Sequence, residues 1–347
     1  MRTRPVLTRV AFLAAAVGLA IGTAVPASGA ATTGWRVVKI FGPAEGVWAD
    51  NFVATGAGDA WSTWDAVSHS LVERWTGRAW RQVPVPPNLA GDAASSVAIG
   101  ASSASNAWLF DPGKVLRWNG SVWVFSAGVD SMTKPDHFAA HYNGHVWVKV
   151  QLPGVISQVS ALSPTDIWVL GVTTATALGS NPAYILMHWN GKTWATVRIP
   201  KVSPPAGAVE FPVDLAATGP ADAWLQRDIE QGSAGARTLY LLHWNGRSWT
   251  RVNLGFPTSF VDYMTQDGHG GVWMVANGPA RAFRFLTYHL NAGHWTRYTA
   301  PVATGLSLLD LTGISWIPGT RSVWLTGNMT GPPNGNGIFG AILKFGP

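Results

Sequence analysis

The sequence predicts an all-β protein, a β-propeller of four-stranded antiparallel blades, on three observations. A pattern of about 50 residues repeats from residue 34 to the end of the chain. Each copy reads as four short apolar strands separated by turn residues. The two ends of the chain hold complementary parts of one copy. Repeats with four strands each are typical of propellers, whose blades stack around a central axis.

The clearest copy covers residues 159–200, VSALSPTDIWVLGVTTATALGSNPAYILMHWNGKTWATVRIP. SPTD separates two apolar, β-branched runs and reads as a tight turn. Asn190-Gly191 separates YILMHW from TWATVRI, and this dipeptide favours the two positive φ angles of a type I′ turn. Because strand side chains alternate, we expect Trp189 and Trp194 on the same face of the hairpin.

Tryptophan recurs at equivalent positions of the copies. The second strand carries it at Trp61, Trp108, Trp168, Trp224, Trp273 and Trp324. The hairpin recurs as RWTGRAW (74–80), RWNGSVW (117–123), HYNGHVW (141–147), HWNGKTW (188–194), HWNGRSW (243–249) and HLNAGHW (289–295), so that Asn245, Gly246 and Trp249 repeat Asn190, Gly191 and Trp194. This recurrence predicts packing between blades rather than stacking on sugars, with of order 200 Å² buried by each side chain.

The ends of the chain predict how the ring closes. Residues 34–40 (GWRVVKI) match the fourth strand of a blade and have nothing before them to pair with, and the last copy stops at Pro347 without its fourth strand. We therefore expect strand 34–40 to complete the C-terminal blade, which leaves no open edge. Residues 108–153 are compressed relative to the other copies, so the sequence predicts six blades or an irregular seven.

Composition limits the class of protein. Cysteine is absent from the 347 residues, which excludes disulfides and cysteine-ligated metals. The formal charge is +6, but three arginines lie in residues 1–30, so the remainder carries 21 minus 18, or +3. Because Lys and Arg form no cluster, we expect no nucleic-acid partner.

Residues 1–30 read as a secretory signal peptide. A basic start precedes the uncharged run 10–25 (VAFLAAAVGLAIGTAV), and small residues end at Ala30. The alternative is a retained membrane anchor, but this run is shorter than the roughly 20 residues of a spanning helix. We expect a secreted, monomeric protein with one propeller domain, residues 31–347, and no membrane span after cleavage.

Histidines and aspartates repeat with the blades. His141, His188, His243 and His289 hold one repeat position, which could suggest a metal, but equivalent positions lie around a ring and no H-x-H or H-E-x-x-H spacing occurs. Asp59, Asp166 and Asp222 stand two residues before the repeated tryptophan and read as turn formers that bond backbone amides. We expect no metal, no cofactor and no catalytic residue among them.

Connections between the second and third strands vary most. Residues 172–183, 226–238 and 327–337 read as long loops on the face opposite the Asn-Gly hairpins. Loops on a rigid scaffold often carry function. The candidate binding residues on this long-loop face are Asp65, Asp228, Glu230, Arg237 and Asn328.

The W-N-G-x-x-W hairpin resembles the Asp-box (BNR) hairpin of sialidase-like propellers, S-x-D-x-G-x-T-W. Gly191, Thr193 and Trp194 match its last positions, whereas Met187 and Trp189 replace its Ser and Asp. GGVWMVA (270–276) and DIWVLG resemble the D-G-x-x-W-x-G strands of sensor-type propellers. The resemblance covers nearly all of residues 34–345 and implies the fold alone. Sialidases use an arginine triad, and the first strands here (FVATG, SVAIG, VSAL, DLAAT) contain no arginine.

Three functions are compatible with these observations. The leading hypothesis is a secreted, non-catalytic propeller that binds an extracellular glycan or a protein through its long-loop face. The alternative is an extracellular polysaccharide hydrolase or lyase, since glycoside hydrolysis needs two carboxylates; its candidates are Asp65, Asp228, Glu230 and Asp310. The second alternative is a structural envelope protein.

Overall fold

The structure is a computed structural model, and it describes most of the chain beyond residue 33. The described residues are 34–42, 48–65, 70–85, 98–111, 114–118, 123–128, 138–142, 147–151, 155–163, 165–172, 184–200, 206–231, 236–256, 261–276, 286–331 and 337–347. The expected signal peptide, residues 1–30, lies outside them. All regular elements in these residues are β-strands, so the all-β class is confirmed.

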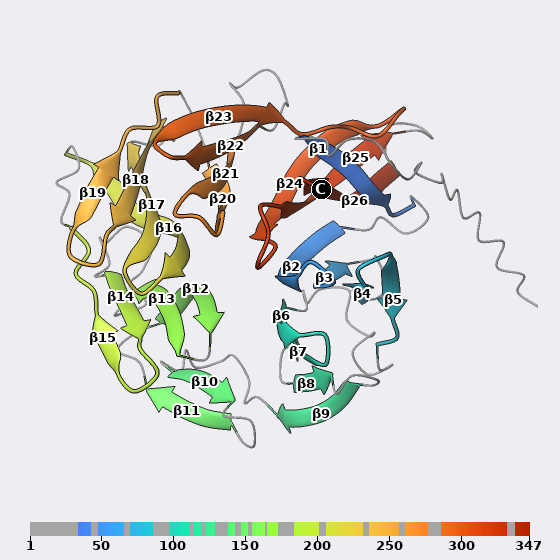
Figure 1. Ribbon diagram of the computed structural model, residues 1–347, viewed down its shortest axis with the longest axis horizontal. Coiled ribbons are helices and arrows are strands. Elements are labelled where there is room, and N and C mark those ends of the chain that lie inside the picture. Colours follow the sequence, from blue (N-terminus) through green and yellow to red (C-terminus); the bar gives the residue numbers. More distant parts are fainter. Residues whose placement is uncertain are drawn as a thin grey trace, which may run out of the picture.

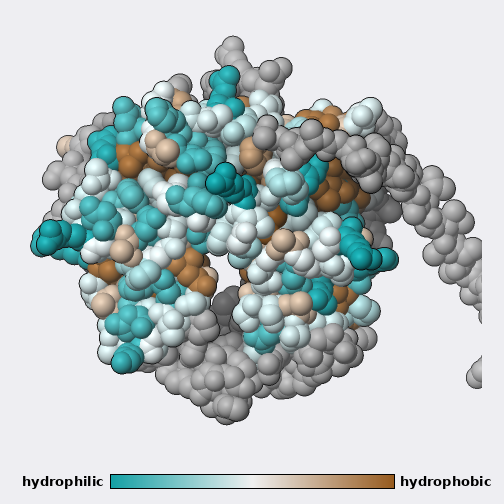
Figure 2. Space-filling model, in the orientation of Figure 1, coloured by the Kyte–Doolittle hydropathy of each residue, from teal (hydrophilic) through white to brown (hydrophobic). Residues whose placement is uncertain are grey.

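The strands form antiparallel sheets arranged radially around an open centre (Figures 1 and 2). This arrangement confirms a β-propeller of four-stranded blades. The first complete sheets are β2 (Trp48–Gly56), β3 (Asp59–Asp65), β4 (Ser70–Trp75) and β5 (Trp80–Val83), and β6 (Ala98–Ser103), β7 (Asn106–Asp111), β8 (Lys114–Trp118) and β9 (Trp123–Gly128).

Two further complete sheets follow a short one, which consists of β10 (Phe138–Tyr142) and β11 (Trp147–Gln151). They are β12 (Val155–Ser163), β13 (Asp166–Val172), β14 (Tyr184–Trp189) and β15 (Trp194–Thr196), and β16 (Ala208–Gly219), β17 (Asp222–Gln231), β18 (Ala236–Trp244) and β19 (Trp249–Val252). The described strands thus include a two-stranded sheet beside four-stranded ones, and a single blade number does not describe this ring.

The last two sheets close the ring. One contains β20 (Val261–Gln266), β21 (Val272–Ala276), β22 (Leu286–Asn291) and β23 (His294–Thr299). The other contains β24 (Ser307–Trp316), β25 (Val323–Gly331), β26 (Gly337–Phe345) and, at its outer edge, β1 (Trp35–Ile40). β1 pairs with β26 in antiparallel register from Trp35 opposite Phe345 to Ile40 opposite Ala341. The N-terminal strand therefore completes the C-terminal sheet, as the sequence predicted.

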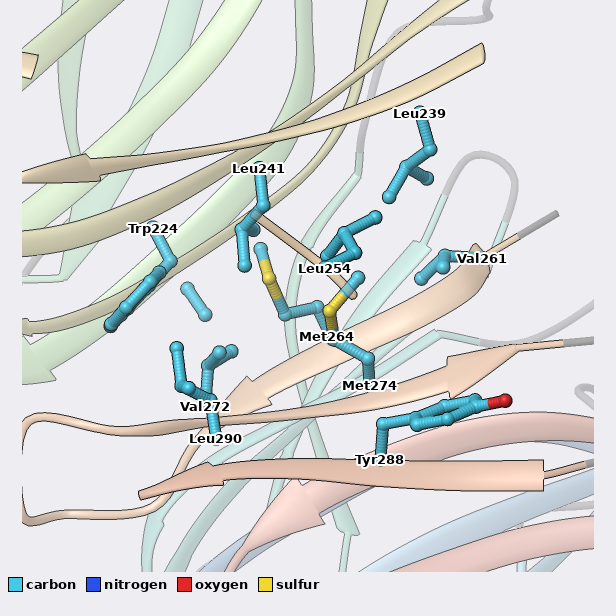
Figure 3. Close-up of a cluster of buried hydrophobic side chains, with 11 residues drawn as sticks. Trp224, Leu239, Leu241, Leu254, Val261, Met264, Val272, Met274, Tyr288 and Leu290 are labelled. Carbon is cyan, nitrogen blue, oxygen red and sulfur yellow. The ribbon is translucent and has the colours of Figure 1, made fainter. Parts of the chain in front are cut away.

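The repeated tryptophans pack between neighbouring sheets. Trp61, Trp168, Trp273 and Trp324 are almost fully buried. Trp224 lies in a cluster with Met264 and Met274 of the next sheet, and Figure 3 shows it across from Val272 and Leu290. Each such side chain buries apolar surface of its own sheet and, at the same time, apolar surface of the neighbouring sheet. The burial of these side chains places them in the packing between sheets.

Outer tryptophans add a second link between sheets through their indole N–H groups. Trp249 donates to the carbonyl oxygen of Arg198 (3.1 Å), and Trp295 donates to that of Asn253 (3.0 Å). Both acceptors belong to the chain that leads from the preceding sheet. The indole N–H groups of these two outer tryptophans are therefore hydrogen-bonded, whereas those of the buried Trp168, Trp224 and Trp324 have no hydrogen-bond partner within the described residues.

The hairpin turns differ from the sequence prediction. Trp189 and Trp194 lie opposite each other with ring centroids 5.6 Å apart, as expected. However, only Gly191 has a positive φ (+89°), so the predicted type I′ turn at Asn190-Gly191 is wrong. Instead, the Asn190 side-chain oxygen accepts hydrogen bonds from the N–H groups of Lys192 (3.0 Å) and Thr193 (2.9 Å), which stabilises a four-residue loop.

Two consecutive positive φ angles occur in the degenerate copy. Ala292 (+48°) and Gly293 (+79°) connect Asn291 to His294, which are paired across the hairpin. These values fit a type I′ turn. The dipeptide Asn-Gly therefore did not identify the turn type, because the asparagine side chain competes for the backbone donors.

Removing β1 tests the closure. A chain that begins at residue 41 leaves the β26 edge unpaired, whereas a chain that begins at residue 31 keeps β1. We expect the shorter chain to unfold at least about 5 °C lower and to self-associate as concentration rises, because open edges pair with other chains. Thermal unfolding and light scattering would show this. Equal melting temperatures and monomeric behaviour would contradict the role of β1.

Candidate functional site

The ring has two chemically different ends. The turns between first and second strands pack on the hairpin turns: a Cβ added to Gly191 would lie 2.9 Å from Thr165, and one added to Gly246 would lie 2.8 Å from Ala221. We call this the hairpin end. Connections from second to third strands, and from one sheet to the next, lie at the opposite end, which we call the loop end.

Three Asp–His pairs lie at the hairpin end. The distances from His Nε2 to the carboxylate oxygen are 2.7 Å for His188 and Asp166, 2.6 Å for His243 and Asp222, and 2.9 Å for His289 and Asp267. Each imidazole also stacks on the tryptophan directly opposite it on the second strand, with centroids 4.1–4.5 Å apart. The pairs therefore stabilise the tryptophans that join the sheets.

The sequence analysis predicted the wrong hydrogen-bond partners for these aspartates. Asp166 and Asp222 contact histidine side chains rather than the expected backbone amides, and Asp59 binds Arg74 Nε (2.9 Å). Arg74 lies over the Trp61 ring in the place that histidine takes elsewhere. The sequence did contain a signal for these partners. The hairpin sets the cross-strand register, and this register places a basic residue opposite each repeated tryptophan, within reach of the aspartate.

Charge at the hairpin end is well compensated. Burial raises the pKa of Asp222, but hydrogen bonds from His243 and Thr218 outweigh it and lower the pKa below its usual value. The pKa of Asp267 is lowered in the same way: burial raises it, but hydrogen bonds from His289 and from two backbone N–H groups outweigh burial. Within the residues that the structure describes, no three His, Cys, Asp or Glu side chains gather where they could hold a metal ion.

The connections that the sequence analysis took for long loops are largely strands. β17 runs to Gln231 and β18 starts at Ala236, so only residues 232–235 lie between them. β25 and β26 likewise occupy most of residues 327–337. The loop prediction there was wrong, because the polar stretch QRDIEQ, whose one apolar residue is Ile229, pairs along its whole length with β16 and β18. Most of the third connection, residues 173–183, lies outside the described residues.

The predicted binding residues are distributed around the ring. Asp65, Asp228 and Asn328 each stand four residues after a repeated tryptophan, on the second strand of three different sheets. Asp228 and Asn328 are almost fully buried. Glu230 lies opposite Arg237 in the β17–β18 ladder. The structure therefore brings Asp228, Glu230 and Arg237 into one hairpin but does not join them to Asp65 or Asn328.

Sequence reasoning missed a buried ion pair at the loop end. Arg227 Nη2 lies 2.6 Å from Glu210 Oε1, and Arg227 Nη1 donates to the carbonyl oxygen of Pro200 (2.5 Å). Tyr184 of the preceding sheet donates its hydroxyl to the Glu210 carbonyl oxygen (3.1 Å). Burial raises the pKa of Glu210 despite the neighbouring guanidinium. The sequence signal for this ion pair was a single acidic residue, Glu210, within the apolar run AVEFPV.

Other carboxyl groups at the loop end also have a pKa that burial raises. Burial raises the pKa of Asp65, which accepts a hydrogen bond from Ser70 (3.3 Å), and of Asp310, which accepts one from Asn328 Nδ2 (2.7 Å). At the hairpin end the pKa of Asp222 is lowered instead. Carboxyl groups with raised pKa values gather at functional sites more often than elsewhere.

A groove of about 620 Å³ opens at the loop end of sheet β16–β19. Its lining combines apolar side chains with a guanidinium and an amide: Leu239, Arg251, Val252, Asn253, Leu254, Gly255 and Phe256. The Arg251 guanidinium lies 3.9 Å from the centre of the Tyr240 ring, which holds this charge beside the groove. Its volume is that of a small-molecule or oligosaccharide site.

One carboxyl group links two inner strands. Asp214 of β16 accepts hydrogen bonds from the N–H groups of Leu215 (2.7 Å) and of Met264 on β20 (2.6 Å). Gln158 holds the equivalent position one sheet earlier, and its side chain donates to the carbonyl oxygen of Val213 (3.4 Å). Complete burial raises the pKa of Asp214 to about 7. This position therefore joins neighbouring sheets near the central axis.

Comparisons with known proteins identify the fold and nothing narrower. No protein-family model matches the chain, and no curated protein matches it. A protein of unknown function from Dyadobacter fermentans has a TM-score of 0.53 at 12% identity, with 90% of this chain and 100% of that one covered. The likeness is one of fold.

Two further solved structures are similar at lower scores. A catalytically inactive virginiamycin B lyase from Staphylococcus aureus has a TM-score of 0.42 at 10% identity, with 88% of each chain covered. The fucose-specific lectin of Aleuria aurantia has a TM-score of 0.43 at 16% identity, with 88% of this chain and 97% of that chain covered.

Asp214 predicts a pH dependence of stability. Its pKa of about 7 in the folded protein exceeds the value of 3.8 expected when unfolded. The stabilisation from the neutral carboxyl group is therefore complete below about pH 4 and is lost as the pH rises to about 7, by at most about 4 kcal/mol. In Asp214→Asn, unfolding midpoints at pH 4.5 and pH 8 should lie closer together than in the unaltered protein. An unchanged difference would contradict this.

Asp222 predicts the opposite slope at lower pH. Its folded-state pKa is lowered, so its stabilisation is present above about pH 4 and is lost as the pH falls through the folded-state value. Asp222→Asn should cost about 1–2 kcal/mol at pH 7 and progressively less below pH 4. Urea unfolding across that range would measure it, with Lys192→Ala at the same end as the control. A constant cost at all pH values would contradict the prediction.

Proposed function

We propose that this protein is a binding propeller whose loop-end groove takes an extracellular glycan. The groove is the single observation that carries the proposal. Arg251 and Asn253 supply polar groups at its surface, while Leu239, Leu254 and Phe256 supply an apolar lining. Saccharides present hydroxyl groups at their edges and C–H groups on their faces, so this mixture of side chains suits them.

The difference between the two ends supports this choice of surface. At the hairpin end, the described carboxylates are bound to His or Arg and their positions repeat from sheet to sheet. At the loop end, the groove lies at one sheet, and the ion pair of Glu210 and Arg227 has no equivalent in the other sheets of the described residues. A surface that departs from the repeat is where a specific ligand has features to recognise.

The remaining expectations from the sequence are part of the same proposal. Residues 1–30 export the chain as a cleaved signal peptide, and residues 31–347 form one monomeric propeller domain. The part of the chain that the structure describes has no helix with the length and apolarity needed to cross a membrane. A protein partner at the loop end is the other form of this binding function, and a structural envelope role would need no ligand there.

A hydrolase remains the alternative because of one strand. Asp228 and Glu230 are two residues apart on the same face of β17, so their Cα atoms lie about 6.6 Å apart. Glycoside hydrolysis uses carboxyl groups about 5–9.5 Å apart. Asp65 and Asp310 lie in two other sheets. Release of reducing ends from cell-wall polysaccharide, abolished in Glu230→Gln, would favour this alternative.

The glycan proposal predicts a difference between two arginines of one sheet. Arg251 lines the groove, and Arg247 is exposed in the hairpin turn four residues earlier. We expect isothermal titration with cell-wall oligosaccharides to show binding that Arg251→Ala weakens at least tenfold and that Arg247→Ala leaves unchanged. Removing one charge-assisted hydrogen bond accounts for such a loss.

Two results would contradict this prediction. Equal affinities of the two variants would move the site away from the groove. If oligosaccharides do not bind, and a pull-down from the surface fraction of the source cell captures nothing that depends on Arg251, the binding function itself is wrong.

A further inference from the structure

The loop-end groove is bordered by two neighbouring sheets. Leu239 and residues 251–256 line it from sheet β16–β19. Phe256, one of these lining residues, stacks on the Tyr288 ring with centroids 3.7 Å apart, and the Trp295 ring lies edge-on to it at 5.2 Å. Tyr288 and Trp295 belong to β22 and β23. The outer strands of the next sheet therefore form the second border of the groove.

Each border carries an exposed arginine. Arg251 of β19 lines the groove itself. Arg297 of β23 is directly opposite Tyr288 in the ladder, so the two side chains lie on the same face of their hairpin. Burial raises the pKa of the Tyr288 hydroxyl, and the charge of Arg297 opposes that rise. Within the described residues, neither guanidinium forms an ion pair with a carboxylate.

Asn253 adds a further hydrogen-bond donor to the lining. Its side-chain oxygen accepts a hydrogen bond from the N–H group of Gly255 (3.0 Å), and its carbonyl oxygen accepts one from the Trp295 indole (3.0 Å). The side-chain nitrogen of Asn253, with its two N–H groups, is then the part available to a ligand. The polar side chains that line the groove thus offer N–H groups to a ligand.

Acidic residues are absent from both borders. Residues 232–261, which include β18 and β19, contain three arginines and no Asp or Glu. Residues 268–309, which include β21, β22 and β23, contain three more arginines and again no Asp or Glu. This composition holds for the connections within both ranges as well, however they fold. The chain around the groove therefore supplies no carboxylate to neutralise its arginines.

The acidic residues of these two sheets lie nearer to the central axis. Figure 1 shows β16, β17 and β20 on the inner side of β19 and β23. The inner strands and the turn after β20 carry all of them: Glu210, Asp214, Asp222, Asp228, Glu230, Asp262 and Asp267. Asp228 is opposite Leu239 of the groove lining, and it is 1% exposed. A ligand in the groove therefore meets exposed positive charge, while the carboxylate opposite the lining is covered by the chain.

We infer that the ligand of the groove is an acidic glycan, whose sugars carry carboxylate or sulfate groups. This inference rests on the proposed glycan-binding function and names the class of glycan. A guanidinium donates two parallel N–H groups to such an anion, and a charged hydrogen bond is about twice as strong as a neutral one. Arg251 and Arg297 hold the acidic groups from the two borders. The apolar side chains of Leu254 and Phe256 contact the C–H faces of the sugars.

Matched pairs of charged and neutral oligosaccharides test the charge. One pair is tetragalacturonate and its fully methyl-esterified form, and the other is a sulfated carrageenan tetrasaccharide and its desulfated form. We expect isothermal titration to show that at least one acidic probe binds at least about tenfold more tightly than its neutral partner. The difference should shrink as NaCl is raised from about 0.05 to about 0.5 M, because salt screens exposed charges. The pair with the larger difference assigns the anion as a carboxylate or a sulfate.

Variants of two exposed arginines locate the charge. Arg297→Ala should weaken binding of the acidic probe at least about fivefold and leave the affinity of its neutral partner unchanged, whereas Arg297→Lys should keep most of the affinity. Arg247→Ala removes the same charge from the hairpin turn of the neighbouring sheet and should leave both affinities unchanged. Because Arg247 and Arg297 are exposed, the melting temperatures of these variants should equal that of the unaltered protein.

Three results would overturn the inference. Charged and neutral probes that bind equally well, both through Arg251, would exclude an acidic ligand and leave the glycan-binding function in place. Equal weakening of the acidic probe by Arg297→Ala and Arg247→Ala would show a general effect of charge without a site at the groove. If neither acidic probe binds although neutral cell-wall oligosaccharides do, the inference alone is wrong; if no oligosaccharide binds, the glycan-binding function is wrong with it.

Discussion

Packing between neighbouring sheets is the interaction on which this structure depends. A four-stranded antiparallel sheet has two faces, and here neither can be covered by helices, because all regular elements of the described residues are strands. Each sheet is therefore stable only beside another. Trp168 and Trp224 repeat at the same strand position because they meet the same requirement, and the histidine stacked on each keeps the indole plane in place.

The sequence was most informative where one requirement recurs. The strand order, the tryptophan positions and the pairing of β1 with β26 followed from comparing copies, since each copy must turn and stack in the same way. It was least informative where a polar side chain could choose between partners. Asn190 bonds backbone N–H groups instead of adopting a positive φ, and Asp222 binds His243 instead of backbone amides.

The candidate site was harder to predict than the fold. Asp228 and Asn328 were singled out as loop residues but are buried in strands. The strands that carry them extend beyond those of most other copies, and a mostly polar extension such as QRDIEQ reads as a loop. The groove is formed by Leu239 of β18 and by residues 251–256 at and after the end of β19, and no repeated motif marks these residues. Arg251 lies beside Tyr240 on the same face of the β18–β19 hairpin.

The sheet that holds both β1 and β26 has a consequence for how the protein assembles. Arg36 and Lys344 are opposite each other in the ladder although almost the whole chain lies between them. Contacts of such long sequence separation are slow to form, because the intervening chain loses its freedom before the contact is made. During synthesis β1 emerges first and has no partner until β26 is complete. The ring therefore closes only after translation of its last strand. A factor that binds the nascent chain before then binds sheets that have not yet closed into a ring.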